Sequence, residues 1–235
     1  MPKGTCKGCL RAGVDLQQSH LMPAGVYRLL DSPRAPNRNP VLVTSQAVVQ
    51  TSRQITEHLL CTSCEQILQR EGEGWVLPLL ATREGAFPLH DILTARPPDL
   101  VMDGATAYAG SSNPRLRVRD MTHFALGIFW KASVHSWKSG PRSAIPRLKL
   151  GSCEQGIRTF LFCDGPFPEN IALAVSVMPV PVTTMVAVQP LKAREADGVF
   201  HFAFMFRELF LFLPLARMGP AMPRAVSTET RRIRS

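Results

Sequence analysis

Four cysteines in two closely spaced pairs are the residues of this chain with the clearest chemistry. Cys6 and Cys9 form the first Cys-x-x-Cys pair, and Cys61 and Cys64 form the second. Two residues between thiolates let both sulfur atoms turn onto one ion, and two such pairs supply the four ligands of a tetrahedral zinc site. The pattern predicts one structural zinc ion. Two other interpretations stay open: four ordinary buried cysteines, or a redox-active pair.

Polar residues with catalytic chemistry lie close to both pairs. Ser19 and His20 follow the first pair in the segment SHLMP (19–23), and Glu65 ends the segment TEHLLCTSCE (56–65). A neutral imidazole is suited to general base catalysis near pH 7, and a carboxylate can hold Mg²⁺ or Mn²⁺. A structural interpretation is also open. In it His20 ends a strand and bonds a backbone carbonyl, while Glu65 is favoured by a helix dipole.

The three segments CKGC (6–9), SHLMP (19–23) and TEHLLCTSCE (56–65) resemble the zinc-bearing HNH endonuclease family. The resemblance covers residues 6–70, a little over a quarter of the chain. It implies a treble clef, in which a zinc knuckle, a hairpin and a helix start hold one zinc ion. The remainder of the chain resembles uncharacterised bacterial proteins.

The family's functional residues match this chain only in part. The resemblance implies that His20 is the general base and that Glu65 is a ligand of a catalytic Mg or Mn ion. Ser19 stands where the family has a metal-ligating His or Asp, and Thr56 stands where it has an Asn. The HNH-like active site is therefore degenerate.

A basic segment covers residues 115–149. The chain has 27 Lys and Arg against 18 Asp and Glu, a formal net charge of +9, and most of this excess lies in that segment. Such a charge favours phosphate contacts, since each neutralised phosphate releases counterions, although a solvated basic face is the alternative. The candidate nucleic-acid-binding residues are Arg115, Arg117, Arg119, Lys138, Arg142, Arg147 and Lys149.

Local patterns within and beside this segment extend the nucleic-acid hypothesis. The three arginines at 115, 117 and 119 alternate, so an extended segment would project them from one face. We expect residues 137–142 to form a loop that adds basic groups. Trp130 and Trp137 are candidates for stacking on bases, with a core position favoured for Trp130.

The elements that must position these residues follow from hydrophobic patterns. Phenylalanines recur at every second position from 200 to 206, which predicts one buried strand over 199–216. The uncharged run 171–190 is interrupted by Pro179 and Pro181 and has many β-branched residues, which favours two strands around a turn over a membrane span. Helices are expected over about 62–72, 118–136 and 151–163. The predicted fold class is α+β, an HNH-like zinc treble clef followed by a mixed helix and strand domain.

Three parts are expected along the chain. Residues 1–80 form the zinc module, residues 81–217 form the α+β domain, and residues 218–235 form a basic, disordered tail. Residues 1–20 lack an apolar run like that of a signal peptide, so we expect a cytoplasmic protein with no membrane association.

Three functions compete on these grounds. The favoured one is a zinc-binding protein that contacts DNA or RNA through its basic surface. The first alternative is a metal-dependent endonuclease, a hydrolase of phosphodiester bonds. The second is a zinc-stabilised subunit that binds a protein partner or a second copy of itself and has no nucleic-acid role.

Overall fold

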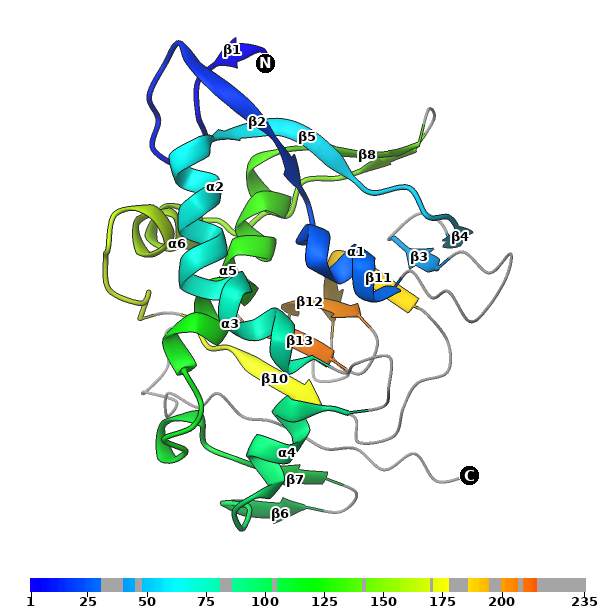
Figure 1. Cartoon of the computed structure of the whole chain (residues 1–235), viewed down its shortest axis with the longest axis vertical. Helices are drawn as coiled ribbons and strands as arrows, with labels where there is room; N and C mark the ends of the chain where they lie inside the picture. Colours follow the sequence, from blue (N-terminus) through cyan, green and yellow to red (C-terminus); the bar gives the residue numbers. More distant parts are fainter. Residues whose placement is uncertain are drawn as a thin grey trace.

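The structure is a computed structural model of the whole chain (Figure 1). It describes residues 1–30, 40–44, 48–80, 86–102, 105–140, 143–169, 171–177, 186–194, 200–206 and 209–214. Helices and strands alternate irregularly through these ranges, which confirms the α+β class. The predicted tail at 218–235 lies outside the described residues.

The N-terminal elements form a small sheet followed by a helix. They are β1 (Lys3–Gly4), β2 (Val14–His20), α1 (Ala24–Leu30), β5 (Thr56–Cys61) and α2 (Thr62–Leu68). The strands are antiparallel in the order β1-β2-β5, and the pairing of β2 with β5 brings His20 opposite Thr56. The sheet therefore places the end of β2 beside the start of β5.

The helix that begins at Thr62 continues well beyond the predicted end at 72. After α2 come a π-helical turn η1 (Gln69–Glu73), α3 (Gly74–Val76) and a 3₁₀ turn η2 (Leu77–Leu79). At Gly72 a Cβ atom would lie only 2.7 Å from the backbone nitrogen of Phe124. A glycine is required there because the π-helical turn meets the backbone of the neighbouring helix directly.

That neighbour is the central helix α5 (Val118–Val134), whose residues are almost all buried. It contacts η1 and α3 on one side and α6 (Cys153–Phe162) on another. The ring of Phe129 packs edge-on against Phe204 of the sheet at 4.9 Å between ring centroids. Both predicted helices, 118–136 and 151–163, are confirmed within two residues at each end.

A six-stranded sheet carries the C-terminal half of the core. Its strand order is β10-β13-β12-β11-β3-β4. The strands are β3 (Val41–Val43), β4 (Val48–Gln50), β10 (Ala174–Val177), β11 (Val186–Arg194), β12 (Phe200–Phe206) and β13 (Leu209–Pro214). The pairing of β11 with β12 shifts register between Val188 and Leu191. Pro190 lies in that interval and has no N–H for the ladder, which accounts for the bulge.

The prediction of one strand over 199–216 is wrong. This region forms two antiparallel strands, with Phe206 paired to Leu209. The charged pair Arg207 and Glu208 separates them in the sequence. Two strands joined as a hairpin can bury the apolar residues of both segments. A single strand would place two charged residues inside the sheet, which is unfavourable, and this explains why the prediction failed. The two strands expected within 171–190 are confirmed as β10 and the start of β11.

Strands β3 and β4 belong to the predicted 1–80 module by sequence, yet they extend the larger sheet. Val41 pairs in parallel with Val186, and Val43 pairs with Val188. One hydrophobic cluster includes residues from both sides of position 80. The boundaries of the three parts stay a prediction, and the two folded parts share contacts in the structure.

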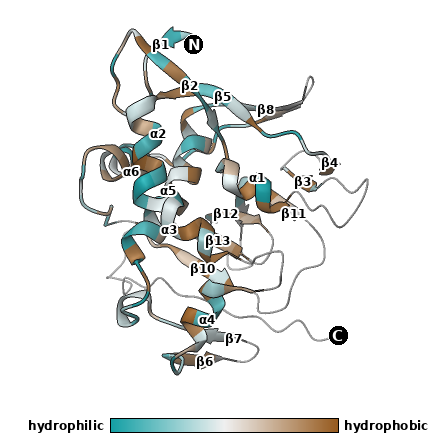
Figure 2. Cartoon of the chain, viewed as in Figure 1, coloured by the Kyte–Doolittle hydropathy of each residue, from teal (hydrophilic) through white to brown (hydrophobic). Residues whose placement is uncertain are grey.

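The remaining described elements are short. They are α4 (Pro88–Thr94), the hairpin of β6 (Leu100–Met102) and β7 (Ala105–Ala107), the 3₁₀ turn η3 (Gly110–Ser112), and the hairpin of β8 (Trp137–Gly140) and β9 (Ser143–Ile145). Figure 2 shows β6 in brown at the periphery, where Leu100 and Val101 are exposed. Among the described residues, no helix has both the length and the apolarity needed to cross a membrane.

Candidate metal centre

The four cysteines of the two pairs meet at one point. The sulfur atoms of Cys6, Cys9, Cys61 and Cys64 all lie within 4.8 Å of one another. The Sγ atoms of Cys9 and Cys61 are 3.8 Å apart. Zn–S bonds of about 2.3 Å in a tetrahedron separate the sulfurs by about 3.8 Å. The cluster therefore has the composition and the size of a four-thiolate zinc site, and three of its four residues are buried.

Local backbone geometry holds the first pair in place. A tight turn after β1 is closed by bonds from the Leu10 amide to the Cys6 carbonyl at 2.9 Å and from the Cys6 amide to the Arg11 carbonyl at 3.0 Å. Leu10 has a positive φ of 63° and Gly13 one of 69°. The left-handed backbone at Leu10 lets the chain reverse directly after Cys9 and close the turn.

The second pair is placed by the junction of a strand and a helix. Cys61 is the last residue of β5, and Cys64 lies in the first turn of α2. The backbone amide of Cys61 donates to the Sγ atom of Cys6 at 3.3 Å. Such an amide bond stabilises a thiolate, which is the form that binds zinc.

Electrostatics at the cluster favour thiolates at some positions. The hydrogen bond from the Cys64 thiol lowers the pKa of Cys6 to about 4, and proximity to Cys6 raises the pKa of Cys64. Burial raises the pKa of Cys9, but hydrogen bonds from Arg11 outweigh it, so the net pKa is lowered. The Nε atom of Arg11 lies 3.4 Å from Cys9 Sγ. A cation here offsets part of the negative charge that four thiolates place around one Zn²⁺ ion.

Gly8 provides the first prediction. A Cβ atom at this position would lie 2.9 Å from Cys64 Sγ and 3.2 Å from the ring of Phe162. We expect Gly8→Ala to displace one thiolate and to weaken zinc binding roughly 10-fold to 100-fold, measured by competition with a chromogenic chelator. Gly156→Ala is the matched control, because its Cβ meets only Pro168 at an ordinary 3.4 Å. Equal zinc affinity in both variants would contradict the prediction.

The other candidate site residues lie on β2 and α2, two elements beside the cysteine cluster: Ser19 and His20 end β2, and Glu65 follows Cys64 in α2. Ser19 is fully buried, and its hydroxyl donates a short hydrogen bond to Oε1 of Glu65. Ser19 Oγ also accepts the Leu60 amide at 3.2 Å. Ser19 therefore orients the Glu65 carboxylate, and Glu65 lies in the first turn of α2 as the helix-dipole interpretation expects.

His20 is the last residue of β2 and is half-buried. Its Nε2 atom lies 2.7 Å from Oε1 of Gln54, an acceptor, so Nε2 carries the proton of this bond. The imidazole bonds a side-chain amide and not the backbone carbonyl that the structural interpretation expected. Burial lowers the pKa of His20 below its usual 6.5, so the ring is neutral at pH 7. A neutral ring with Nε2 protonated leaves Nδ1 as the basic nitrogen.

One residue of this region escaped the sequence analysis. Lys131 belongs to the basic segment by sequence but is only 2% exposed, and its Nζ atom donates to the backbone carbonyl of His20 at 2.6 Å. Burial raises the pKa of Glu73, while the charge of Lys131 opposes that shift. The one feature of the sequence that indicates burial of this lysine is its position inside the apolar segment FALGIFWKAS (124–133).

The predicted nucleic-acid-binding residues fall into two groups at opposite ends of α5. Seventeen residues at 1.5 Å each separate the ends by about 25 Å. Arg115, Arg117 and Arg119 lie at the first end. The expected extended segment is wrong, since α5 begins at Val118 and places Arg119 on a helix. The segment from Val118 onward is mostly apolar and forms a buried helix, and this outweighs the alternation of three arginines.

Two of these arginines are already engaged within the protein. Arg117 forms an ion pair with Asp120, and Arg119 forms one with Asp164, each at 2.7 Å. Arg119 also stacks over the ring of Phe160. These contacts compete with phosphate for the same guanidinium groups.

The second group lies at the other end of α5, close to the zinc module. Lys138 is exposed on β8, and the β8–β9 hairpin contacts β5 (Figure 1). Arg147 donates to the Ser133 carbonyl at 2.6 Å, and Lys149 is exposed. Residues 137–140 and 143–145 pair as two strands, whereas we expected a loop over 137–142; Pro141 and Arg142 lie outside the described residues.

Neither tryptophan is available to stack on a base. Trp130 and Trp137 are both fully buried. The indole nitrogen of Trp137 donates to the Lys131 carbonyl at 2.9 Å. The core position favoured for Trp130 is confirmed. The stacking role considered for Trp137 is wrong, because its ring is buried against the C-terminal end of α5.

Among the described residues, the other cysteines and histidines do not form a second cluster that could bind a metal ion. Cys153 is buried, whereas Cys163 is exposed at the end of α6. Within the part of the chain that the structure describes, the four-cysteine cluster is the one group of three or more His, Cys, Asp or Glu side chains close enough to share an ion.

No protein-family model, no curated protein and no solved structure matches this chain. The cysteine cluster and the side chains around His20 are therefore the features from which a function can be inferred.

Proposed function

We propose that this protein is a zinc-stabilised module that binds nucleic acid. The observation that carries the proposal is the convergence of four cysteine sulfurs within 4.8 Å. Four thiolates complete the coordination of Zn²⁺ and leave no open position, so the ion is structural and not catalytic. The order of turn, hairpin and helix around the ion supports an HNH-like treble clef.

The nucleic-acid role is supported by charge close to this module. Lys138 and Lys149 are exposed, and neither forms an ion pair with any residue that the structure describes. They lie near the end of α5 that adjoins the zinc module, where Arg147 donates to the Ser133 carbonyl and forms an ion pair with Glu154 at 3.9 Å. A formal charge of +9 adds long-range attraction for a polyanion. The phosphate backbone is the chemical group that this surface fits best.

The test is binding of labelled single-stranded and double-stranded DNA and RNA, measured by fluorescence anisotropy from 50 to 200 mM salt. We expect affinity to fall steeply with salt, because each phosphate contact contributes about 0.9 to the logarithmic slope for B-DNA. Replacing Lys138 and Lys149 with alanine should reduce that slope by about 2. The matched control replaces Lys3 and Arg70, two exposed cations elsewhere. No binding to any of the four substrates would overturn the proposal and favour a protein partner.

A second candidate function is metal-dependent hydrolysis of phosphodiester bonds. It is favoured by the grouping of His20, a neutral imidazole, with Glu65, a carboxylate held by Ser19. Glu65 would bind Mg²⁺ or Mn²⁺ together with water and phosphate oxygens, and His20 would accept a proton from the attacking water. One carboxylate from the protein is enough for such a site, because bound Mg²⁺ keeps several of its water ligands.

Plasmid nicking separates this candidate from pure binding. Incubation with Mg²⁺ or Mn²⁺ should produce nicked circles with the native protein and none with His20→Ala, while both proteins bind the plasmid equally. Plasmid binding without cleavage at any metal concentration would contradict the nuclease function and leave nucleic-acid binding as the remaining function.

A further inference from the structure

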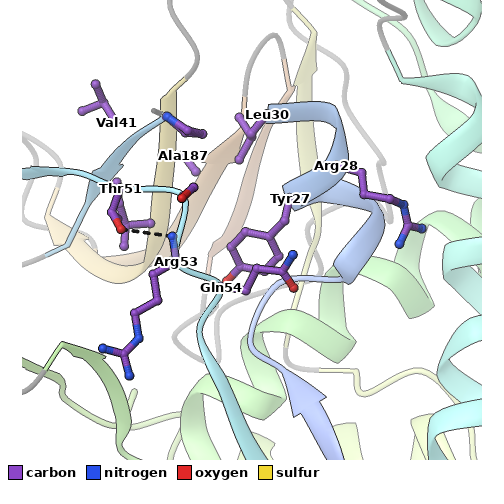
Figure 3. A pocket seen from close by; sticks show the side chains of 11 residues that line it. Tyr27, Arg28, Leu30, Val41, Thr51, Arg53, Gln54 and Ala187 are labelled. Carbon is purple, nitrogen blue, oxygen red and sulfur yellow. Dashed lines mark hydrogen bonds between the residues drawn. The ribbon is translucent and has the colours of Figure 1, made fainter. Parts of the chain in front are cut away.

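A small pocket lies beside His20, on the side of its imidazole that faces Gln54. Its volume is about 60 Å³, and it opens between α1, the segment before β5 and the strands β3 and β11 (Figure 3). Apolar groups form one side and polar groups form the other. The lining residues are Tyr27, Arg28, Leu30, Pro40, Val41, Leu42, Thr51, Ser52, Arg53, Gln54 and Ala187.

The polar side of the pocket is a firmly held turn. The Thr51 amide donates to the Pro40 carbonyl at 2.9 Å, and the Arg53 amide donates to the Thr51 hydroxyl at 3.0 Å. The Ile55 amide then donates to the hydroxyl of Tyr27 at 3.2 Å. Burial raises the pKa of Tyr27 to about 12, so this hydroxyl stays protonated. The turn therefore presents its side chains from a fixed backbone.

The charge of the pocket is entirely positive. Its lining contains two arginines and no Asp or Glu. The guanidinium of Arg53 forms no ion pair with the residues that the structure describes. In Figure 3 the side chains of Arg28 and Arg53 extend from opposite sides of the pocket. Rotation about the methylene stem of Arg53 can bring its head group over the opening.

The floor of the pocket adds a neutral donor. The Oε1 atom of Gln54 accepts the proton on His20 Nε2, so the amide NH₂ group of Gln54 keeps its donors for another acceptor. Behind it, Lys131 holds the carbonyl of His20. The lining therefore contains donors and cations and no carboxylate.

We propose that this pocket binds a phosphate group, with Arg53 as its cation and the Gln54 amide as its neutral donor. Guanidinium groups match the paired oxygens of phosphate, and the hydroxyls of Thr51 and Ser52 complete a polar cradle. The pocket would hold one phosphate of a bound nucleic acid, so this inference rests on the nucleic-acid-binding function proposed above. A bound strand would lie with one phosphate beside the imidazole of His20.

The test uses two probes on the zinc-loaded full chain, inorganic phosphate and a labelled oligonucleotide. Phosphate should shift the NMR signals of the Arg53 Nε–H, the Gln54 NH₂ and the His20 ring, and these shifts should vanish in Arg53→Ala. Oligonucleotide affinity should fall about 10-fold in Arg53→Ala. The matched control Lys3→Ala removes the same charge from exposed β1, at the far end of β2 from His20, and should weaken binding less than twofold.

The possible outcomes separate this subsite from the wider function. Oligonucleotide binding that is equally affected by Arg53→Ala and Lys3→Ala, with no phosphate-induced shifts, overturns the subsite and leaves the binding module intact. Phosphate-induced shifts without any oligonucleotide binding support the pocket as a site for a free phosphate compound and overturn the nucleic-acid function. Arg53→Lys keeps the charge but not the paired donors, so an intermediate affinity confirms recognition by the guanidinium.

Discussion

Replacing Cys61 with serine is expected to abolish stoichiometric zinc binding and to unfold the N-terminal part of the chain. Cys61 is buried, and its sulfur lies 3.8 Å from that of Cys9. Apparent zinc-binding free energies of small zinc modules are roughly 10–16 kcal/mol at pH 7. Loss of one of four thiolates removes a large share of that stabilisation, which is comparable with the usual stability of a whole domain.

Mass spectrometry of metal content and thermal unfolding together measure this effect. We expect one zinc per native chain, much less than one in Cys61→Ser, and a transition at a far lower temperature. Cys163→Ser is the control, because Cys163 is an exposed thiol outside the cluster. A full zinc complement and an unchanged transition in Cys61→Ser would refute the metal centre.

The exchange of Lys131 for methionine is expected to have the second largest effect. The ammonium group is buried and bonded to the His20 carbonyl at 2.6 Å, while methionine keeps the volume of the stem. A hydrogen bond from a charged group contributes about 1.5–3 kcal/mol, and its loss leaves a carbonyl unpaired. We expect a decrease of about 2 kcal/mol in the free energy of unfolding, measured by denaturant titration. Lys138→Met makes the same change at an exposed position and should alter stability little.

The same variant tests the electrostatic coupling between Lys131 and His20. Burial is the main cause of the lowered pKa of His20, and the nearby charge of Lys131 adds to it. Because the folded-state pKa is below 6.5, stability from the neutral ring is lost as pH falls from about 6.5 through that pKa. Lys131→Met should raise the pKa of His20 and shrink this loss, as followed by NMR titration of the ring. An unchanged pKa would show that the two groups are not coupled.

The two proposals depend on different residues and can fail separately. The metal centre rests on four cysteines, whereas the phosphate pocket rests on Arg53 and Gln54 of the turn before β5. The zinc module positions that turn through β5, whose last residue is Cys61. Loss of zinc should therefore weaken phosphate binding, but loss of Arg53 should leave zinc content unchanged.

Local sequence features predicted the metal ligands and the main helices. Two Cys-x-x-Cys pairs bring their own sulfurs together through short-range geometry, and only the meeting of the pairs needs the fold. The helices at 118–134 and 153–162 follow from the residues within each segment, and the first is a long, mostly apolar run typical of a core helix. Period-two alternation likewise identified the region of β12 and β13, although the intervening charges make it a hairpin.

Tertiary structure decided what each charged or aromatic residue does. Lys131 and Lys138 are seven residues apart and alike in sequence, yet one is buried against the His20 carbonyl and the other is exposed. Trp137 is buried because a hairpin folds back on α5. The pocket joins Arg28, Arg53 and Ala187 through the parallel pairing of β3 with β11. These contacts span up to about 150 residues, and no local pattern encodes them because their energy comes from burial that forms only when distant segments meet.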